Sequence, residues 1–353
     1  MWQIFVYIEV FILAFIAIYG NAKTRKGDFF VRKFVYLSLV ILACTRNYSG
    51  YPDYIGYNGY EQEYNRFAIM SFESIIDQFD ILKDPVYYLV GSVFGKLGLP
   101  FRIWIAVIAV FSIAALINYV WKYSQNRGLS MLLYCTFGYF FFSLCGLRQA
   151  IAIGFIFYAY IQAKEQHLVK FCVLVVMATM FHESALIFLP AYFIISREKP
   201  NKRTAMLLVP IAVILLIRSD LVISFLKIII INDTRFEGVL SGAQEGLNAT
   251  NGIIFTAILI YSFTIRHANA DIGKQIDCLT LLVIGWFFRM FSMVMSVSFR
   301  LAMYYDIFII SYIPERYIGS GKNKTDVKTY AIIGMCLLYF VFFSGRSFGA
   351  FNW

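Results

Sequence analysis

The sequence predicts an all-α, polytopic integral membrane protein with about 12 transmembrane helices, and three observations support this. Of its 353 residues, 60% are hydrophobic and only 15% are charged, whereas a soluble domain has about 45–50% apolar and 25% charged residues. The mean hydropathy is +0.69. Apolar runs recur along the whole chain, and no polar stretch is long enough to fold alone. We therefore expect residues 1–353 to form a single integral membrane domain.

The apolar runs define the expected helices in order. The first has no basic segment before it and no cleavage site after it, so we interpret it as a membrane helix rather than a signal peptide. Several others are shorter than the ~20 residues of a full span, which favours tilted or re-entrant helices. Residues 85–99 are a candidate re-entrant half-helix, since Asp84 and Pro85 are typical of an N-cap and a first turn. The expected spans lie near residues 2–20, 34–45, 101–121, 129–146, 149–163, 168–181, 184–195, 204–218, 252–266, 276–297, 300–314 and 329–345.

Basic residues gather in alternate loops and predict the orientation of the helices. They lie close to helix ends on one side, which the positive-inside rule assigns to the cytoplasm. The net charge of +10 thus reflects membrane topology, and we expect no nucleic-acid partner. Both termini and two long loops, residues 46–100 and 219–251, then face outward. The basic clusters are Lys23–Lys33, Lys122 with Arg127, Lys164 with Lys170, Arg197–Arg203, Arg266 with Lys274, and Arg316–Lys328.

The first outer loop is rich in aromatic residues and carboxylates. Aromatic faces with nearby carboxylates are typical of a sugar-binding cleft, although an interfacial belt of tyrosines would have the same composition. The loop includes Tyr51, Asp53, Tyr54, Tyr57, Tyr60, Glu61, Glu63 and Tyr64. The six cysteines have no metal-ligand spacing, and no acidic metal cage is visible. We therefore expect no metal and no cofactor.

Arg148 lies in Gly146-Leu147-Arg148-Gln149, between two apolar runs. A charge at the centre of a membrane helix costs about 2.5–3.5 kcal/mol, so it is a functional-site hypothesis by default. The guanidinium offers a planar fork of donors suited to phosphate. Gly146 would let a ligand approach closely. The alternative is an arginine that snorkels to the interface.

Two more arginines accompany apolar runs. Arg289 lies well inside one, so it needs a carboxylate, a carbonyl or a ligand phosphate as partner. Arg300 lies where one expected helix gives way to the next, and Asp306, six residues later, is a poor same-face partner for it. If several outward arginines converge on one cavity, they form an anion site.

His182 lies in Phe181-His182-Glu183-Ser184-Ala185 and is one of only three histidines. An imidazole could act as a general base near neutral pH. A triad with Glu183 and Ser184 is not expected, because sequence neighbours do not face each other on a helix. The other reading is a histidine that ends a helix. Asp53, Glu61 and Glu63 are alternative bases.

These motifs together resemble a known family. Asp84-Pro85-Val86-Tyr87-Tyr88, Gly146–Ala152 and Ala178–Leu186 are similar to the motifs of EpsG-type proteins, which belong with the Wzy-like polymerases of exopolysaccharide, capsule and O-antigen. The outer-loop pattern Arg46…Asp53…Tyr57…Tyr64…Phe67 resembles the stretch that precedes them in the family. The resemblance spans roughly residues 1–310.

The resemblance implies a GT-C-like fold and a glycosyltransferase of the bacterial cytoplasmic membrane with its site outside. A growing glycan would move from undecaprenyl diphosphate onto a lipid-linked repeat unit. Membrane lipid, a chain-length regulator and a flippase are the implied partners. Arg148, Arg289 and Arg300 suit the diphosphate and His182 is the leading base, with Asp53 and Glu183 behind it. Gln149, Tyr87, Tyr88, Tyr57 and Tyr304 are further candidate substrate-binding residues.

Two competing functions stay open. A lipid-linked oligosaccharide flippase would need cations along a path open to both sides, whereas these arginines gather toward the outer half. A membrane O-acyltransferase would draw its acyl donor from the cytoplasmic side, whereas His182 is expected to face outward.

Overall fold

The computed structural model describes residues 2–19, 25–46, 59–77, 84–197, 202–220, 247–264, 272–295, 298–317 and 327–344. Within these ranges the chain forms helices and no strand, which confirms the all-α prediction. Contacts divide the chain into two compact units, and each is described separately. Unit 1 comprises Met1–Gln162, His167–Leu186 and Ile313–Trp353; unit 2 comprises Ala163–Gln166 and Ile187–Tyr312.

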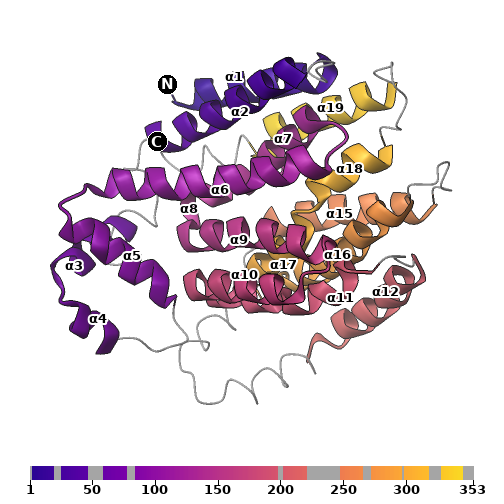
Figure 1. Ribbon diagram of the computed structural model, residues 1–353. Helices are drawn as coiled ribbons and strands as arrows, with labels where there is room; N and C mark the ends of the chain where they lie inside the picture. The colour runs from indigo at the N-terminus through magenta and orange to yellow at the C-terminus, as the bar shows by residue number, and fades with distance from the viewer. Residues whose placement is uncertain are drawn as a thin grey trace. The chain divides into compact units, whose positions relative to one another are not determined.

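The N-terminal part of unit 1 is built from long apolar helices (Figure 1). Helix α1 (Trp2–Tyr19) packs against α2 (Arg25–Thr45) and α7 (Arg127–Thr136), and α2 packs against α6 (Phe101–Tyr123). A Cβ at Gly128 would lie 2.5 Å from the backbone nitrogen of Ala17, so only glycine allows α7 to approach α1 this closely. Large apolar side chains of α1 are exposed, as expected of a surface that faces lipid. They are Ile4, Phe5, Ile8, Phe11 and Phe15.

Among the described residues, α1 and α6 are long and apolar enough to cross a membrane alone. Helices α7 and α8 (Tyr139–Cys145) would make a third span, bent by 55°. The single helix expected at residues 129–146 is therefore broken. Gly138 lies at the break with a φ of +85°, a left-handed conformation that favours glycine. Further apolar helical segments of the described residues are 10–17 residues long, which is shorter than a full span.

The predicted outer loop contains helices that position the site. Residues 85–99, the candidate re-entrant half-helix, contain the helix α5 (Pro85–Lys96), and its re-entry into a membrane stays a prediction. Helices α3 (Tyr60–Ile69) and α4 (Phe72–Asp77) were not predicted. Helices α3 and α4 pack on α5, which also contacts α10 (Leu168–Phe181). Aromatic and aliphatic side chains from α3, α5, α6, α9 (Leu147–Lys164) and α10 form one core beneath them. It comprises Tyr64, Tyr87, Phe101, Trp104, Ile105, Ile108, Leu147, Ile151 and Phe181.

Helix α10 ends at His182, whose extended backbone leads into the 3₁₀ helix η1 (Glu183–Ala191) and then α11 (Tyr192–Ile195). The span expected at 184–195 is therefore 3₁₀ for most of its length. The other helices among the described residues of unit 2 are α12 (Lys202–Ile217), α15 (Leu247–Thr264), α16 (Ile272–Phe291) and α17 (Ser298–Asp306). Helix α18 (Ile309–Tyr317) begins in unit 2 and ends in unit 1. Because α17 ends at Asp306, the single helix expected at 300–314 is divided at residues 307–308. In unit 1, α19 (Val327–Tyr339) continues as the π-helix η3 (Phe340–Ser344).

Candidate functional site

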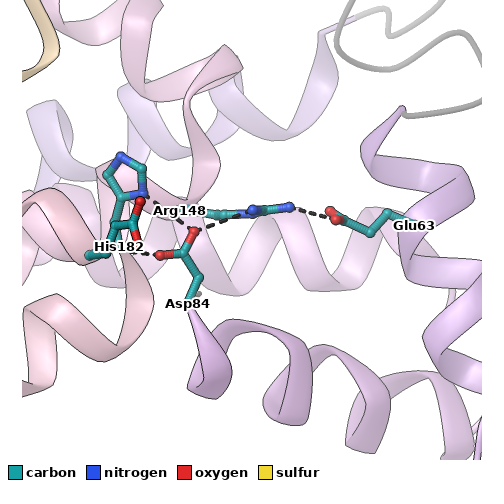
Figure 2. Close-up of polar contacts among 5 residues, drawn as sticks. Glu63, Asp84, Arg148 and His182 are labelled. Carbon is teal, nitrogen blue, oxygen red and sulfur yellow. Dashed lines mark hydrogen bonds and ion pairs between the residues drawn. The ribbon is translucent and has the colours of Figure 1, made fainter. Parts of the chain in front are cut away.

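A polar cluster of unit 1 joins four segments that are far apart in the sequence (Figure 2). Arg148, in the first turn of α9, donates from Nη2 to Glu63 Oε1 of α3 at 2.5 Å. Its Nη1 donates to Oδ2 of Asp84, the residue before α5, at 3.2 Å. Figure 2 shows the guanidinium lying between these two carboxylates, with His182 on the far side of Asp84. Arg148 is thus held by specific partners, which a snorkelling side chain would not need.

Aromatic rings surround the same guanidinium. The carbon Cζ of Arg148 lies 4.7 Å from the ring centroid of Tyr88, 5.1 Å from that of Tyr87 and 5.8 Å from that of Tyr60. Cation–π contacts at this range are attractive, and more so where water is excluded. The Arg148 side chain is 24% exposed. Three tyrosines thus surround Arg148, and part of its side chain is still accessible.

Asp84 does not act as the helix cap that the sequence predicts. Its backbone is left-handed, with φ 39° and ψ 44°, and its side chain makes no capping hydrogen bond to α5. The carboxylate instead contacts Arg148 and His182 through Oδ2 and accepts the backbone N–H of Glu183 through Oδ1 at 2.9 Å. A left-handed non-glycine residue is strained and persists where its surroundings hold it in place. These three contacts from other segments provide such a hold.

The charge state of Asp84 follows from its surroundings. Burial raises its pKa, but His182, the charge of Arg148 and the Glu183 N–H lower it more, so the pKa lies below its usual range. Asp84 is therefore ionised at neutral pH and accepts hydrogen bonds only.

His182 ends α10, with its side chain 16% exposed and its Nδ1 3.4 Å from Asp84 Oδ2. Its carboxylate partner comes from 98 positions earlier in the chain. The neighbouring Glu183 has an exposed side chain and contributes its backbone N–H to Asp84. His182 thus ends the helix and contacts Asp84 through its imidazole, and its role as a base stays a prediction.

The charges at Arg148 limit what it can do. One guanidinium faces two carboxylates, so the three groups carry a net charge of −1. A diphosphate would be repelled by both carboxylates unless one of them moved away. Glu63 is the carboxylate that can move more readily, because its side chain is 18% exposed whereas that of Asp84 is 7% exposed and held by three partners.

The remaining predicted residues lie in different surroundings. Gln149 is buried at the start of α9. In unit 2, Arg300 is exposed with its guanidinium over the Phe299 ring, and Tyr304 is fully buried. Because Arg148 belongs to unit 1, convergence of these arginines on one cavity stays a prediction. Asp53 and Tyr57 lie outside the described residues.

Arg289 pairs with a carboxylate, which is one of the partners expected for a charge inside an apolar run. Its Nε donates to Oδ2 of Asp306 at 2.6 Å, and the ring of Phe255 covers its guanidinium at 4.7 Å. Both charged residues are buried. A Cβ at Gly285 would lie 2.7 Å from the Asp306 backbone nitrogen, so glycine lets α16 and α17 meet at this pair. The carboxylate satisfies Arg289 without a ligand phosphate.

A cavity of about 10 Å³ lies beside the cluster, lined by Glu63, Tyr64, Phe67, Tyr87, Tyr88, Gly91 and Trp104. This volume suits about one water molecule and is too small for a sugar. Among the described residues, no group of three or more His, Cys, Asp or Glu side chains could hold a metal ion.

Two members of the cluster were not assigned their roles from the sequence. Asp84 was interpreted as a cap and Glu63 as one of several alternative bases. The available signal was the Asp84-Pro85-Val86-Tyr87-Tyr88 motif, which marked Asp84 as part of a functional segment. Nothing local links it to residues 64 and 98 positions away.

Comparison with known proteins identifies the family to which the chain belongs. A family model described as the EpsG family matches residues 29–353. No curated protein and no solved structure matches the chain. The chain therefore belongs to the EpsG family, whose role is of the polysaccharide-polymerase type, and is a membrane protein of polysaccharide biosynthesis.

Proposed function

We propose that this protein is a polysaccharide polymerase that transfers a growing glycan from undecaprenyl diphosphate onto a lipid-linked repeat unit. The observation that carries the proposal is the meeting of Arg148 and His182 on the two sides of Asp84. The reaction needs a cation for the departing diphosphate and a base for the attacking hydroxyl. In the cluster, Arg148 of α9 would provide the cation and His182 at the end of α10 would provide the base.

In the proposed step, the acceptor hydroxyl oxygen forms a bond to the anomeric carbon of the donor glycan. The bond between that carbon and the diphosphate oxygen breaks, and its electron pair leaves with undecaprenyl diphosphate. The hydroxyl proton passes to Nε2 of His182. Asp53 and Glu183 are the second choices for this base.

Arg148 is proposed to receive the diphosphate in place of Glu63. The N–H groups of its planar guanidinium then donate to phosphate oxygens instead of to a carboxylate. Arg300, whose side chain is exposed in unit 2, stays a candidate phosphate-binding residue from the sequence alone. Tyr60 and Tyr88 would offer apolar faces to sugar rings next to the reacting bond.

The distribution of basic residues supports a site on the outer face. Helix α9 begins beside the cluster and ends at Lys164, and α10 starts near Lys170 and ends at His182. Lys122 lies in the last turn of α6, whose first residues join the core beneath the site. These lysines thus lie at the helix ends opposite to the cluster, as the positive-inside rule requires if the cluster faces outward. The proposal includes a bacterial cytoplasmic membrane location and about 12 spans in a GT-C-like arrangement, with the short apolar helices tilted or paired.

The direct test is purified protein reconstituted into sealed liposomes that carry undecaprenyl-diphosphate-linked repeat units. A ladder of product lengths is expected. Movement of intact substrate between leaflets without a ladder would identify a flippase and overturn the proposal.

Arg148→Ala should abolish the ladder while single lipid-linked units persist. Because this change leaves two carboxylates without their cation, Arg148→Lys is a second variant that keeps the charge but loses the fork. It should fold normally and elongate poorly. Arg127→Ala is the matched control, since Arg127 also pairs with an aspartate, Asp28, in unit 1. A normal ladder from Arg148→Ala would refute its assignment.

A further inference from the structure

Asp84 is the residue on which the cluster converges. It is 5% exposed, its backbone is left-handed, and its carboxylate contacts residues of α9 and of the junction between α10 and η1. Asp84 is not needed to neutralise Arg148, because Glu63 alone would balance the charge of the guanidinium. We therefore look for the role of Asp84 in its contacts on the other side, with His182 and Glu183.

The two carboxylate oxygens have different tasks. Oδ1 accepts the N–H of Glu183 at 2.9 Å, which fixes the carboxylate plane relative to the residue that follows His182. Oδ2 is then directed toward the His182 ring and lies 3.4 Å from Nδ1. This distance is at the long end for a hydrogen bond, and such contacts shorten in substrate complexes. His182 and its carboxylate acceptor are therefore aligned through the adjacent peptide.

The protonation state of the imidazole follows from the acceptor it faces. An ionised carboxylate has no proton to donate, so the contact is a hydrogen bond only if His182 Nδ1 carries the hydrogen. In a neutral imidazole one nitrogen is the donor and the other the acceptor. With the hydrogen on Nδ1, the Nε2 atom is bare and can receive a proton.

We propose that Asp84 is a positioning residue that holds His182 in the tautomer with hydrogen on Nδ1, so that Nε2 is the basic atom. This inference rests on the proposed function, since it names the atom that accepts the hydroxyl proton. Through its contact with Arg148, Asp84 also ties the base to the phosphate anchor, so the two groups keep a common geometry across α5, α9 and α10.

The tautomer can be observed directly. In a background carrying His167→Gln and His267→Gln, His182 is the one histidine left in the chain. Nitrogen-15 NMR of histidine-labelled protein, recorded at alkaline pH where imidazole is neutral, distinguishes a protonated nitrogen from a bare one. Wild-type Asp84 should give a protonated Nδ1 and a bare Nε2. A hydrogen on Nε2 instead would overturn the proposal, whatever the activity of the protein.

Asp84→Asn is the informative variant. Its amide oxygen can accept the Glu183 N–H, which turns the NH₂ group toward Nδ1 and favours hydrogen on Nε2. We expect this tautomer change and a fall in kcat of roughly 10²–10⁴-fold, the usual contribution of a general base, with a smaller change in KM. Asp84→Glu keeps an ionised acceptor and should retain the wild-type tautomer. An Asp84→Asn protein that keeps the wild-type tautomer and kcat would refute the role.

A matched control is Asp28→Asn, because Asp28 also pairs with an arginine in unit 1. It should leave the tautomer and kcat unchanged; a tautomer change here would overturn the proposal. If Asp84→Asn does not fold, the wild-type spectrum alone decides the question. The tautomer measurement and the product ladder test two different proposals. A ladder with hydrogen on Nε2 refutes only the role of Asp84, and no ladder with hydrogen on Nδ1 refutes only the proposed function.

Discussion

Glu63→Gln tests whether a phosphate takes the place of a carboxylate on Arg148. Glu63 Oε1 lies 2.5 Å from Nη2 of Arg148 and so covers one edge of the guanidinium. A diphosphate that binds there has to break this contact. The glutamine variant keeps the size of the side chain and removes its charge, so binding should become tighter.

The size of the effect follows from the contact that is lost. The glutamine amide still accepts a hydrogen bond from the charged guanidinium, so the variant loses the charge–charge part of the contact alone. For ion pairs whose side chains are partly exposed, here 18% for Glu63 and 24% for Arg148, that part is about 0.2–1 kcal/mol. Since 1.4 kcal/mol is about tenfold in affinity, we expect binding to tighten by up to about fivefold.

The assay is the Kd of inorganic pyrophosphate and the inhibition constant of undecaprenyl diphosphate, measured in nanodiscs. Glu61→Gln is the control, because it makes the same charge change on α3 at an exposed position. It should alter affinity by less than about twofold, since exposed charges are screened. Unchanged or weaker pyrophosphate binding by Glu63→Gln would refute displacement and leave Arg148 as a structural cation.

Two further predictions concern stability. Asp306→Asn should lower the free energy of unfolding by about 3–5 kcal/mol, because it leaves the buried Arg289 without its carboxylate. The double variant Arg289→Met/Asp306→Leu should recover most of that loss in thermal unfolding, and a single variant as stable as wild type would contradict a structural pair. Gly95→Ala should cost about 1–3 kcal/mol, since its Cβ would collide with Ala68 of α3. Gly334→Ala, whose Cβ meets no atom within 4 Å, is the control, and equal stabilities of the two variants would contradict the reasoning.

The fold class could be predicted because it depends on composition and on the length of apolar runs. The breaks inside those runs could not. Residues 129–146 form one apolar stretch, yet Gly138 adopts a left-handed conformation that divides it into α7 and α8. Hydropathy does not record such a turn, because the flanking side chains stay apolar on both sides. Helices α3 and α4 were missed because both are short and polar residues interrupt their apolar positions, so neither forms an apolar run.

Two residues of the cluster, Arg148 and His182, were singled out from the sequence alone. Arg148 and His182 attracted attention because an ionisable group beside apolar runs needs a reason to be there. Asp84 was read as a cap, since a local interpretation considers only the turn that follows it. Arg289 was known to need a partner, and α17 supplied Asp306 through a close helix contact at Gly285.

By itself the sequence determined the membrane class, the family motifs and the two residues most worth testing. Each of these depends on transfer free energies or motifs that are read along the chain. The tertiary structure alone decided which carboxylates neutralise Arg148 and which one faces His182. The energy of an ion pair falls with the distance between its charges, and that distance is set by how α3, α5, α9 and α10 pack. For the same reason, the pairing of Arg148 with Glu63 could not be predicted from residues 146–149 alone.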